Sequence, residues 1–115
     1  MGAYSRSKGK RGELQWRDEC RKHGYDAMRG AQSNGAVIAD VIGLPGIHIE
    51  CKFVERLNLR AAMAQSENDA KDGEVPIVAH KSNRKPWLVT MNSEDFFKLY
   101  EAWRSDNGQN FRARQ

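Results

Sequence analysis

Two neighbouring segments in the first half of the chain have the patterns of β-strands. Residues 36–43 are apolar on both faces apart from Asp40, and residues 47–54 alternate between apolar and polar side chains. The pair Pro45-Gly46 between them is typical of a tight turn. The pattern therefore predicts a hairpin that turns Asp40 towards the polar face of the second strand. That face carries His48, Glu50 and Lys52.

The rest of the chain alternates helical and extended patterns. Apolar residues at helical spacing predict helices over 9–23, 59–71 and 94–103. Gly24 and Gly73 are expected to end the first two helices, and Ser93 to cap the third. Short apolar runs predict further strands over 25–29, 75–80 and 87–91. The order α-β-β-β-α-β-β-α predicts an α/β fold, a central mixed sheet of about five strands flanked by helices, whose two hydrophobic central strands are covered on both faces.

Charge and composition are those of one globular domain with basic ends. The 115 residues carry a net charge of +4, with 39% hydrophobic and 30% charged residues. We predict flexible basic arms over 1–8 and 104–115 that hold a polyanion such as nucleic acid, although solvated tails would explain the charge equally well. No apolar run is long enough to span a bilayer or to act as a secretory signal. Cys20 and Cys51 form no Cys-x-x-Cys pair, so a reduced, cytoplasmic protein is expected.

Asp40 is the residue that most directly indicates chemistry. An unpaired carboxylate among apolar neighbours is costly, so Asp40 needs a cation, a charged partner, or backbone hydrogen bonds at a strand end. Glu50 and Lys52 alone would indicate a solvated face, but opposite Asp40 they predict two carboxylates and an amine in one place. Carboxylate oxygens suit Mg²⁺, which activates water for attack on a phosphate. We expect phosphodiester hydrolysis, with Asp40, Glu50 and the Cys51 carbonyl as ligands and Lys52 beside the water.

Four other polar residues are less specific candidates. Glu13 either pairs with Arg17, one helical turn on, or points at the site. Ser33, in a glycine-bordered loop, either meets a phosphate or is a plain turn residue. Gln65 lies away from the apolar face of its predicted helix, where it contacts either the site or solvent. His48 either contacts DNA or the ligands around the metal, or lies at the surface, which is the expected position.

The hairpin residues resemble the PD-(D/E)xK nuclease superfamily. Its hallmark is an aspartate at a strand end, a short turn, and then Glu-x-Lys on the next strand. Here these positions are Asp40 and Glu50-Cys51-Lys52, with Ala39 in place of the proline in the superfamily's name.

Within that superfamily the chain is most similar to archaeal-type Holliday junction resolvases and their phage-borne relatives. The likeness extends over residues 8–80 and then changes, because Asn83-Arg84-Lys85-Pro86-Trp87 looks more like small phage nucleases. The matching segments are 8–13, 24–25, 29, 33, 38–41 and 49–52.

The resemblance implies a restriction-endonuclease-like core and a homodimer that nicks branched DNA with Mg²⁺, for which Mn²⁺ substitutes. A phage-encoded enzyme of this kind would act in the host cytoplasm. The implied catalytic residues are Glu13, Ser33, Asp40, Glu50 and Lys52. The implied metal ligands are Asp40, Glu50, the Cys51 carbonyl and, through a water, Glu13. The implied DNA contacts are Lys8, Lys10, Arg11, Arg29, Ser33, Asn34, Gln65, Arg84 and Lys85.

Two alternatives stay open at this point. The chain could be a phage nuclease that acts on other duplex, flapped or single-stranded DNA. It could also be a non-catalytic DNA-binding module on the same fold.

Overall fold

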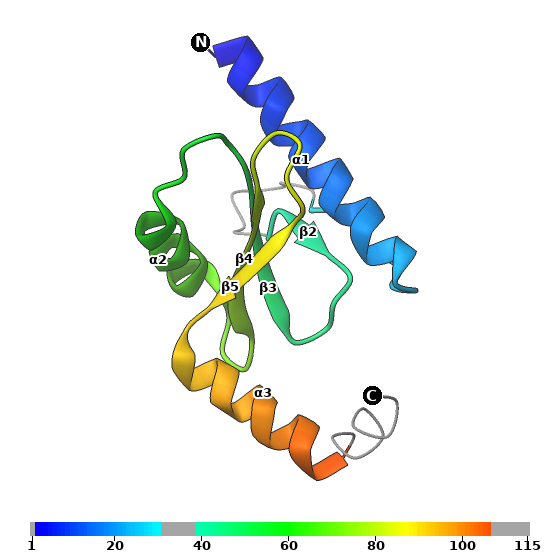
Figure 1. Ribbon diagram of the computed structural model, residues 1–115, viewed down its shortest axis with the longest axis vertical. Helices are drawn as coiled ribbons and strands as arrows, with labels where there is room; N and C mark the ends of the chain where they lie inside the picture. The colour runs from blue at the N-terminus through cyan, green and yellow to red at the C-terminus, as the bar shows by residue number, and fades with distance from the viewer. Residues whose placement is uncertain (1, 31–38, 107–115) are drawn as a thin grey trace.

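The computed structural model describes residues 2–30 and 39–106, which form helices and strands in the predicted order (Figure 1). The helices are α1 (Gly2–Lys22), α2 (Leu59–Asp69) and α3 (Ser93–Asp106). The strands are β1 (Met28–Arg29), β2 (Val41–Ile42), β3 (Ile47–Phe53), β4 (Val75–Lys81) and β5 (Leu88–Met91). The predicted α/β architecture is confirmed.

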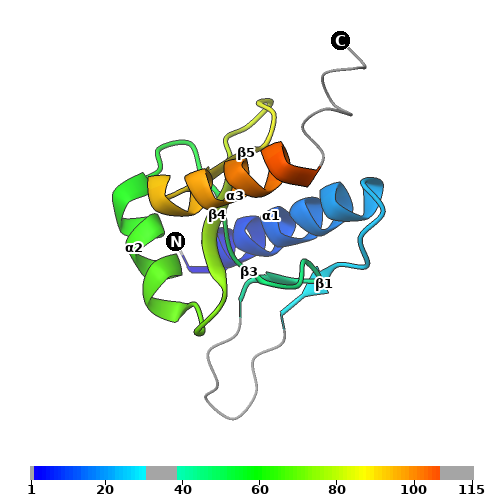
Figure 2. The ribbon, with the colours of Figure 1, turned by 90° about the horizontal axis from the view of Figure 1, so that it is seen from below.

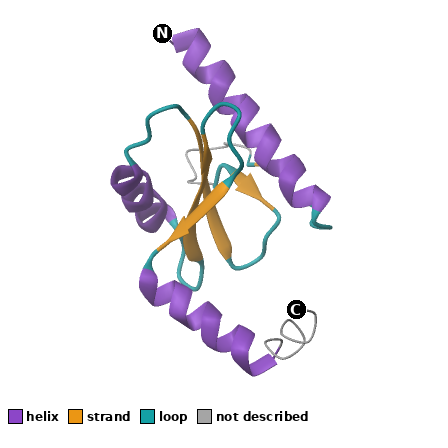
Figure 3. Ribbon diagram, viewed as in Figure 1, coloured by secondary structure: helices purple, strands orange, loops and turns teal. Residues whose placement is uncertain are grey.

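All five strands belong to one mixed sheet, in the order β1-β2-β3-β4-β5 (Figure 3). Neighbouring strands are antiparallel, except that β3 and β4 are parallel and are joined through α2. The register places Glu50 beside Val78 and Lys52 beside His80. Because β3 is third in the order of five strands, the strand that carries the predicted Glu-x-Lys motif is the central strand of the sheet.

Helices α1 and α2 cover opposite faces of the sheet (Figure 2). Helix α1 packs its buried Trp16 and Cys20 into one core with Ile49 and Cys51 of β3. On α2 the fully buried Ser66 donates a 2.9 Å hydrogen bond from its hydroxyl to the carbonyl of β4 residue Ile77. Because successive residues of a strand face opposite sides, the polar residues of β3 lie on the α2 side.

The turn of the hairpin forms as predicted. The Ile47 N–H donates a 3.0 Å hydrogen bond to the Leu44 carbonyl, and Gly46 has φ +88°, which a type II turn requires after Pro45. Strand β2 is shorter than predicted, and residues 36–38 of the predicted strand lie outside the described residues. The expected cover on both faces is wrong for β2, because Ile42 is 40% exposed and α2 packs mainly on β3 and β4.

The helix ends agree only in part with the predictions. Helix α1 begins at Gly2, so residues 2–8 of the predicted arm are helical, and it ends as expected before Gly24, which has φ +93°. At α3 the cap is Asn92 rather than Ser93, because the Asn92 Oδ1 accepts a 2.9 Å hydrogen bond from the Asp95 N–H. The second predicted arm is helical to residue 106, and residues 107–115 lie outside the described part of the chain.

Helix α3 follows β5 and extends beyond the end of the sheet (Figure 1). It presents large exposed apolar side chains. These are Phe96, Phe97, Leu99 and Tyr100. Within residues 2–30 and 39–106, no helix has the length and apolar character needed to cross a membrane.

Candidate active site

Asp40 lies immediately before β2, where the hairpin opens. Its backbone N–H donates a 3.0 Å hydrogen bond to the Ile49 carbonyl, and its Oδ2 accepts a 2.9 Å hydrogen bond from the Cys51 N–H. The side chain thus continues the pairing of β2 with β3 beyond the last paired backbone residue. The backbone hydrogen bond expected of a strand-end aspartate is present, and it fixes this carboxylate over β3.

Glu50 is buried beside Asp40. Only 3% of Glu50 is exposed, and its Oε1 lies 3.2 Å from Nε2 of His48. Burial and then the negative charge of Asp40 raise the pKa of Glu50 to about 7, although the hydrogen bond with His48 opposes the shift. Two neighbouring carboxylates that disfavour each other's charge are stabilised by a proton or a cation between them. The Asp40–Glu50 pair therefore has the chemistry of a cation site.

Lys52 lies on the same face of β3, two residues after Glu50. Its Nζ lies 3.5 Å from Oε1 of Gln65 on α2, so Gln65 reaches the site. Cys51 between the two charged residues points to the opposite face, where it is buried. Burial, followed by the charge of Asp40, raises the pKa of the Cys51 thiol, so this side chain stays protonated at neutral pH and is no nucleophile.

Glu13 approaches the same hairpin from α1. Its Oε1 lies 2.8 Å from Nε of Arg29, which belongs to β1 and pairs with the first residue of β2 after Asp40. The alternative ion pair with Arg17 is wrong, because Arg17 pairs with its helix neighbour instead. The charge of Glu13 also acts on Cys51. The structure thus brings Glu13 and Arg29 to the strand edge that carries Asp40.

Basic side chains gather around Phe53, at the end of β3. The ring centroid of Phe53 lies 4.9 Å from Lys8 Nζ, 5.3 Å from Lys81 Nζ and 5.8 Å from Arg11 Cζ. Glu55 ties this cluster to the β4–β5 loop, since its Oε2 lies 3.6 Å from Lys8 Nζ and accepts a 2.7 Å hydrogen bond from the backbone N–H of the loop. The other predicted basic contacts in the described residues are exposed. These are Lys10, Arg84 and Lys85.

Two predicted site residues, Ser33 and Asn34, lie outside the described residues. Conversely, the sequence did not single out two carboxylates near His48 and Glu50. A carboxylate oxygen of Asp69 lies within 4.8 Å of donor atoms of both residues, and Oε1 of Glu74 lies 3.8 Å from Nδ1 of His48. The expectation for His48 was wrong, because it is 3% exposed. The sequence signal for its burial was its spacing: His48 and Glu50 are two residues apart on β3 and therefore point to the same face.

The fold can be compared with that of known proteins. It is similar to the structure of Hjc, a Holliday junction resolvase from the archaeal hyperthermophile Archaeoglobus fulgidus, with a TM-score of 0.51. The match covers 71% of this chain and 75% of that protein at 22% sequence identity. The chain has the fold of that resolvase. No protein-family model and no curated protein matches the chain.

The resolvase-like fold agrees with the nuclease resemblance of the hairpin sequence. In this fold the described chain collects two carboxylates, an amine and a glutamine amide around the central strand β3. Such a set can hold a hard divalent cation through carboxylate oxygens and place an ammonium group beside it.

Proposed function

We propose that the protein is a metal-dependent endodeoxyribonuclease of the PD-(D/E)xK type that nicks branched DNA. The observation that carries the proposal is the buried Glu50 held beside Asp40, with Lys52 on the same strand face. Burying two carboxylates lowers the stability of the fold. Their position next to an amine is therefore better explained by a role in hydrolysis than by a role in folding.

The donor set fits Mg²⁺. Asp40 and Glu50 supply carboxylate oxygens. Burial and the charge of Asp40 raise the pKa of Glu50, and a dication between the two carboxylates would offset both effects. The Cys51 carbonyl would be a further ligand, and Glu13 would act through a water. When bound, Mg²⁺ or Mn²⁺ lowers the pKa of a coordinated water and polarises the scissile phosphate.

The remaining residues act on the substrate and the water. Lys52 orients the attacking water and stabilises the charge that builds on the phosphate, and Gln65 holds the Lys52 amine in place from 3.5 Å. Arg29 keeps Glu13 at the strand edge through a 2.8 Å ion pair. Ser33 and Asn34, which lie outside the described residues, would contact the DNA backbone.

DNA is the polyanion that suits this chemistry and the net charge of +4. The cluster around Phe53 and the exposed Lys10, Arg84 and Lys85 would contact phosphates on either side of the cut. DNA affinity is then expected to fall steeply with salt, because each phosphate contact releases counterions. The buried free thiols of Cys20 and Cys51 suit the reducing cytoplasm, and a phage origin would place the enzyme in its host's cytoplasm.

A homodimer would supply the two active sites that paired nicks need. We place its interface on α3, whose exposed aromatic side chains already stack on one another: Phe96 and Tyr100 lie 6.3 Å apart between ring centroids. Two α3 helices packed antiparallel would set Glu94 and Asp95 of one copy against Arg104 of the other. This helix is thus self-complementary in charge as well as apolar.

The interface is testable by sedimentation. We expect Phe97→Asp to convert the dimer to a monomer, whereas Val54→Asp, an equivalent change at an exposed apolar residue off α3, leaves it a dimer. A wild-type monomer at micromolar concentration would remove the dimer from the proposal and leave the hydrolytic chemistry standing.

The function is tested by cleavage of four DNAs in Mg²⁺: a four-way junction, a flap, a linear duplex and a single strand. We expect paired nicks in the junction and little cutting of the duplex. Asp40→Asn should lose more than the roughly 10–100-fold that an outer-shell change costs a metal site. The exposed Asp18→Asn is the matched control and should cut normally.

The outcomes separate the alternatives. Equal cutting of all four DNAs would refute a resolvase and favour a nuclease of broader specificity. Binding of DNA without cleavage in either Mg²⁺ or Mn²⁺ would favour the non-catalytic module.

A further inference from the structure

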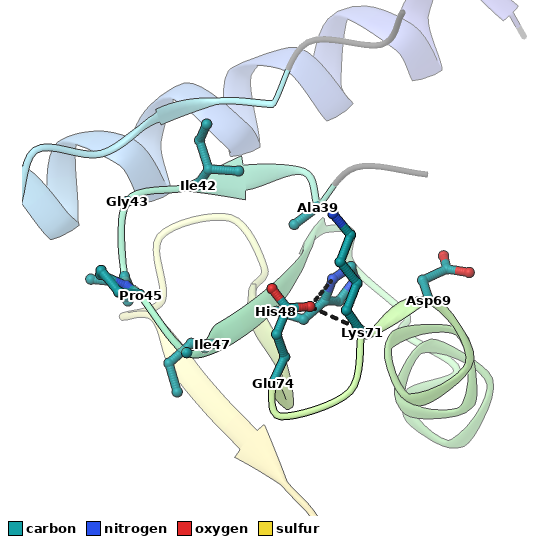
Figure 4. A pocket seen from close by; sticks show the side chains of 11 residues that line it. Ala39, Ile42, Gly43, Pro45, Ile47, His48, Asp69, Lys71 and Glu74 are labelled. Carbon is teal, nitrogen blue, oxygen red and sulfur yellow. Dashed lines mark hydrogen bonds and ion pairs between the residues drawn. The ribbon is translucent and has the colours of Figure 1, made fainter. Parts of the chain in front are cut away.

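A pocket of about 220 Å³ opens beside His48, whose ring contacts Glu50. It lies between the β2–β3 turn, the end of α2 and the loop before β4 (Figure 4). His48, Asp69 and Glu74 line it. The proposed hydrolytic chemistry uses none of these three side chains.

His48 lies between two carboxylates. Its Nε2 is 3.2 Å from Glu50 Oε1, and its Nδ1 is 3.8 Å from Glu74 Oε1. The same Glu74 oxygen accepts a 2.8 Å hydrogen bond from the backbone N–H of Lys71, which fixes it. A neutral imidazole carries one ring proton, so it can donate to only one of these carboxylates. If that proton faces Glu74, the lone pair of Nε2 faces Glu50, and either a proton on Glu50 or a metal ion has to lie between the two atoms.

This is the arrangement in which histidine ligates metals. A ligating imidazole commonly directs its second ring nitrogen to a carboxylate, which fixes the tautomer, and Glu74 stands in that position. The 3.2 Å between Nε2 and Oε1 suits two ligands that each lie about 2.1 Å from one ion. Asp69 offers a third ligand: one donor atom from each of His48, Glu50 and Asp69 lies within 4.8 Å of the others.

We propose that His48, Glu50 and Asp69 bind a divalent transition-metal ion such as Zn²⁺, with Glu74 orienting His48 from behind. Asp69 is the last residue of α2 and is half-buried, so its side chain has room to move in by the roughly 1 Å that coordination needs. The imidazole nitrogen selects for Zn²⁺ over Mg²⁺, which prefers oxygen.

The site adds to the proposed function without depending on it. Glu50 would face the proposed Mg²⁺ position with Asp40 and the new ion with His48. An ion held by His48 and Asp69 would therefore also fix the position of the Glu50 carboxylate.

The test is calorimetric titration of the chelator-treated full chain with Zn²⁺, in the absence of DNA. We expect Asp69→Asn to weaken Zn²⁺ affinity by about 10-fold or more. The control Asp72→Asn, an exposed aspartate three residues on, should change it less than about twofold, within the small effect typical of such surface changes. Asp40→Asn should weaken it less than Asp69→Asn does.

A second measurement needs no variant. Nitrogen NMR of the histidine rings in the wild-type chain should show the Nε2 resonance of His48 moving on addition of Zn²⁺. Four results would each overturn the site: no binding of Zn²⁺, equal affinities for the Asp69 and Asp72 variants, a larger loss with Asp40→Asn, or an Nε2 resonance of His48 that does not move in excess Zn²⁺. Failure to cleave DNA would refute the nuclease and leave these results unaffected.

Discussion

Gly12 allows α1 to approach β3 closely, and replacing it tests how the helix is docked. A Cβ built at Gly12 would lie 2.6 Å from Phe53 Cβ and 3.5 Å from Phe53 Cγ and Cδ2. The contact involves the first carbon of the Phe53 side chain, which cannot move without its backbone. At Gly9, one turn earlier in the same helix, a Cβ would meet no atom of the described residues within 4 Å outside its own surroundings. The two glycines therefore form a matched pair.

The expected magnitudes follow from these contacts. Each Gly→Ala change in a helix gains up to about 1 kcal/mol from lower backbone entropy in the unfolded chain. Gly9→Ala should gain this amount. Gly12→Ala must also relieve the overlap with Phe53, which costs about 1–3 kcal/mol in a packed interior. The overlap alone sets the difference between the two variants, because the helix contribution cancels.

Urea and thermal unfolding of the two variants measure that difference. We expect Gly12→Ala to melt at least about 4 °C below Gly9→Ala, because 1 kcal/mol shifts a domain of this size by roughly that much. Glu13 follows Gly12, so the shifted helix should also weaken the ion pair of Glu13 with Arg29. Equal stability of the two variants would mean that α1 does not pack on Phe53 as the structure has it.

Three further changes have defined outcomes. Ser66→Ala leaves the buried Ile77 carbonyl without its 2.9 Å hydrogen bond and should cost about 1–3 kcal/mol in urea unfolding. In metal-free protein, the pKa of Glu50, raised by burial from 4.5 to about 7, makes the folded state bind more protons than the unfolded chain between these pH values. Stability should therefore fall, by on the order of 3 kcal/mol, as pH rises through this window, and Glu50→Gln should remove that dependence. Finally, Arg29→Ala should lower nuclease activity but change the free energy of unfolding by less than about 1 kcal/mol, because the ion pair of Arg29 with Glu13 is partly exposed. A loss of stability large enough to explain the lost activity would assign Arg29 a structural role.

The sequence predicted the hairpin well because its signals are local. Alternation along β3 and the type II turn at Pro45-Gly46 depend on neighbouring residues, and together they bring Asp40 to Glu50. The sequence also indicated that Asp40 lies at the end of a strand, because this position depends on neighbouring residues too.

The remainder of the site depends on tertiary packing that the sequence pattern does not contain. The burial of His48 comes from α2 and the loop before β4, and its contact with Glu74 spans 26 residues of chain. Glu13 finds Arg29 rather than Arg17 because α1 docks on β1. The cap of α3 differs for a local reason: Asn92 and Ser93 are both good capping residues, and the side chain of Asn92 makes the hydrogen bond.

The most direct test of the central claim is cleavage of a synthetic four-way junction by Lys52→Ala, beside wild type and the exposed-lysine control Lys22→Ala. In the proposed mechanism, Lys52 is the residue that positions the attacking water beside the carboxylates. We predict that wild type and Lys22→Ala cut in Mg²⁺ and not in chelator, and that Lys52→Ala folds, binds the junction and loses about 100-fold or more of the rate. Cleavage by Lys52→Ala at the wild-type rate would contradict the assignment of the β2–β3 hairpin as the catalytic centre.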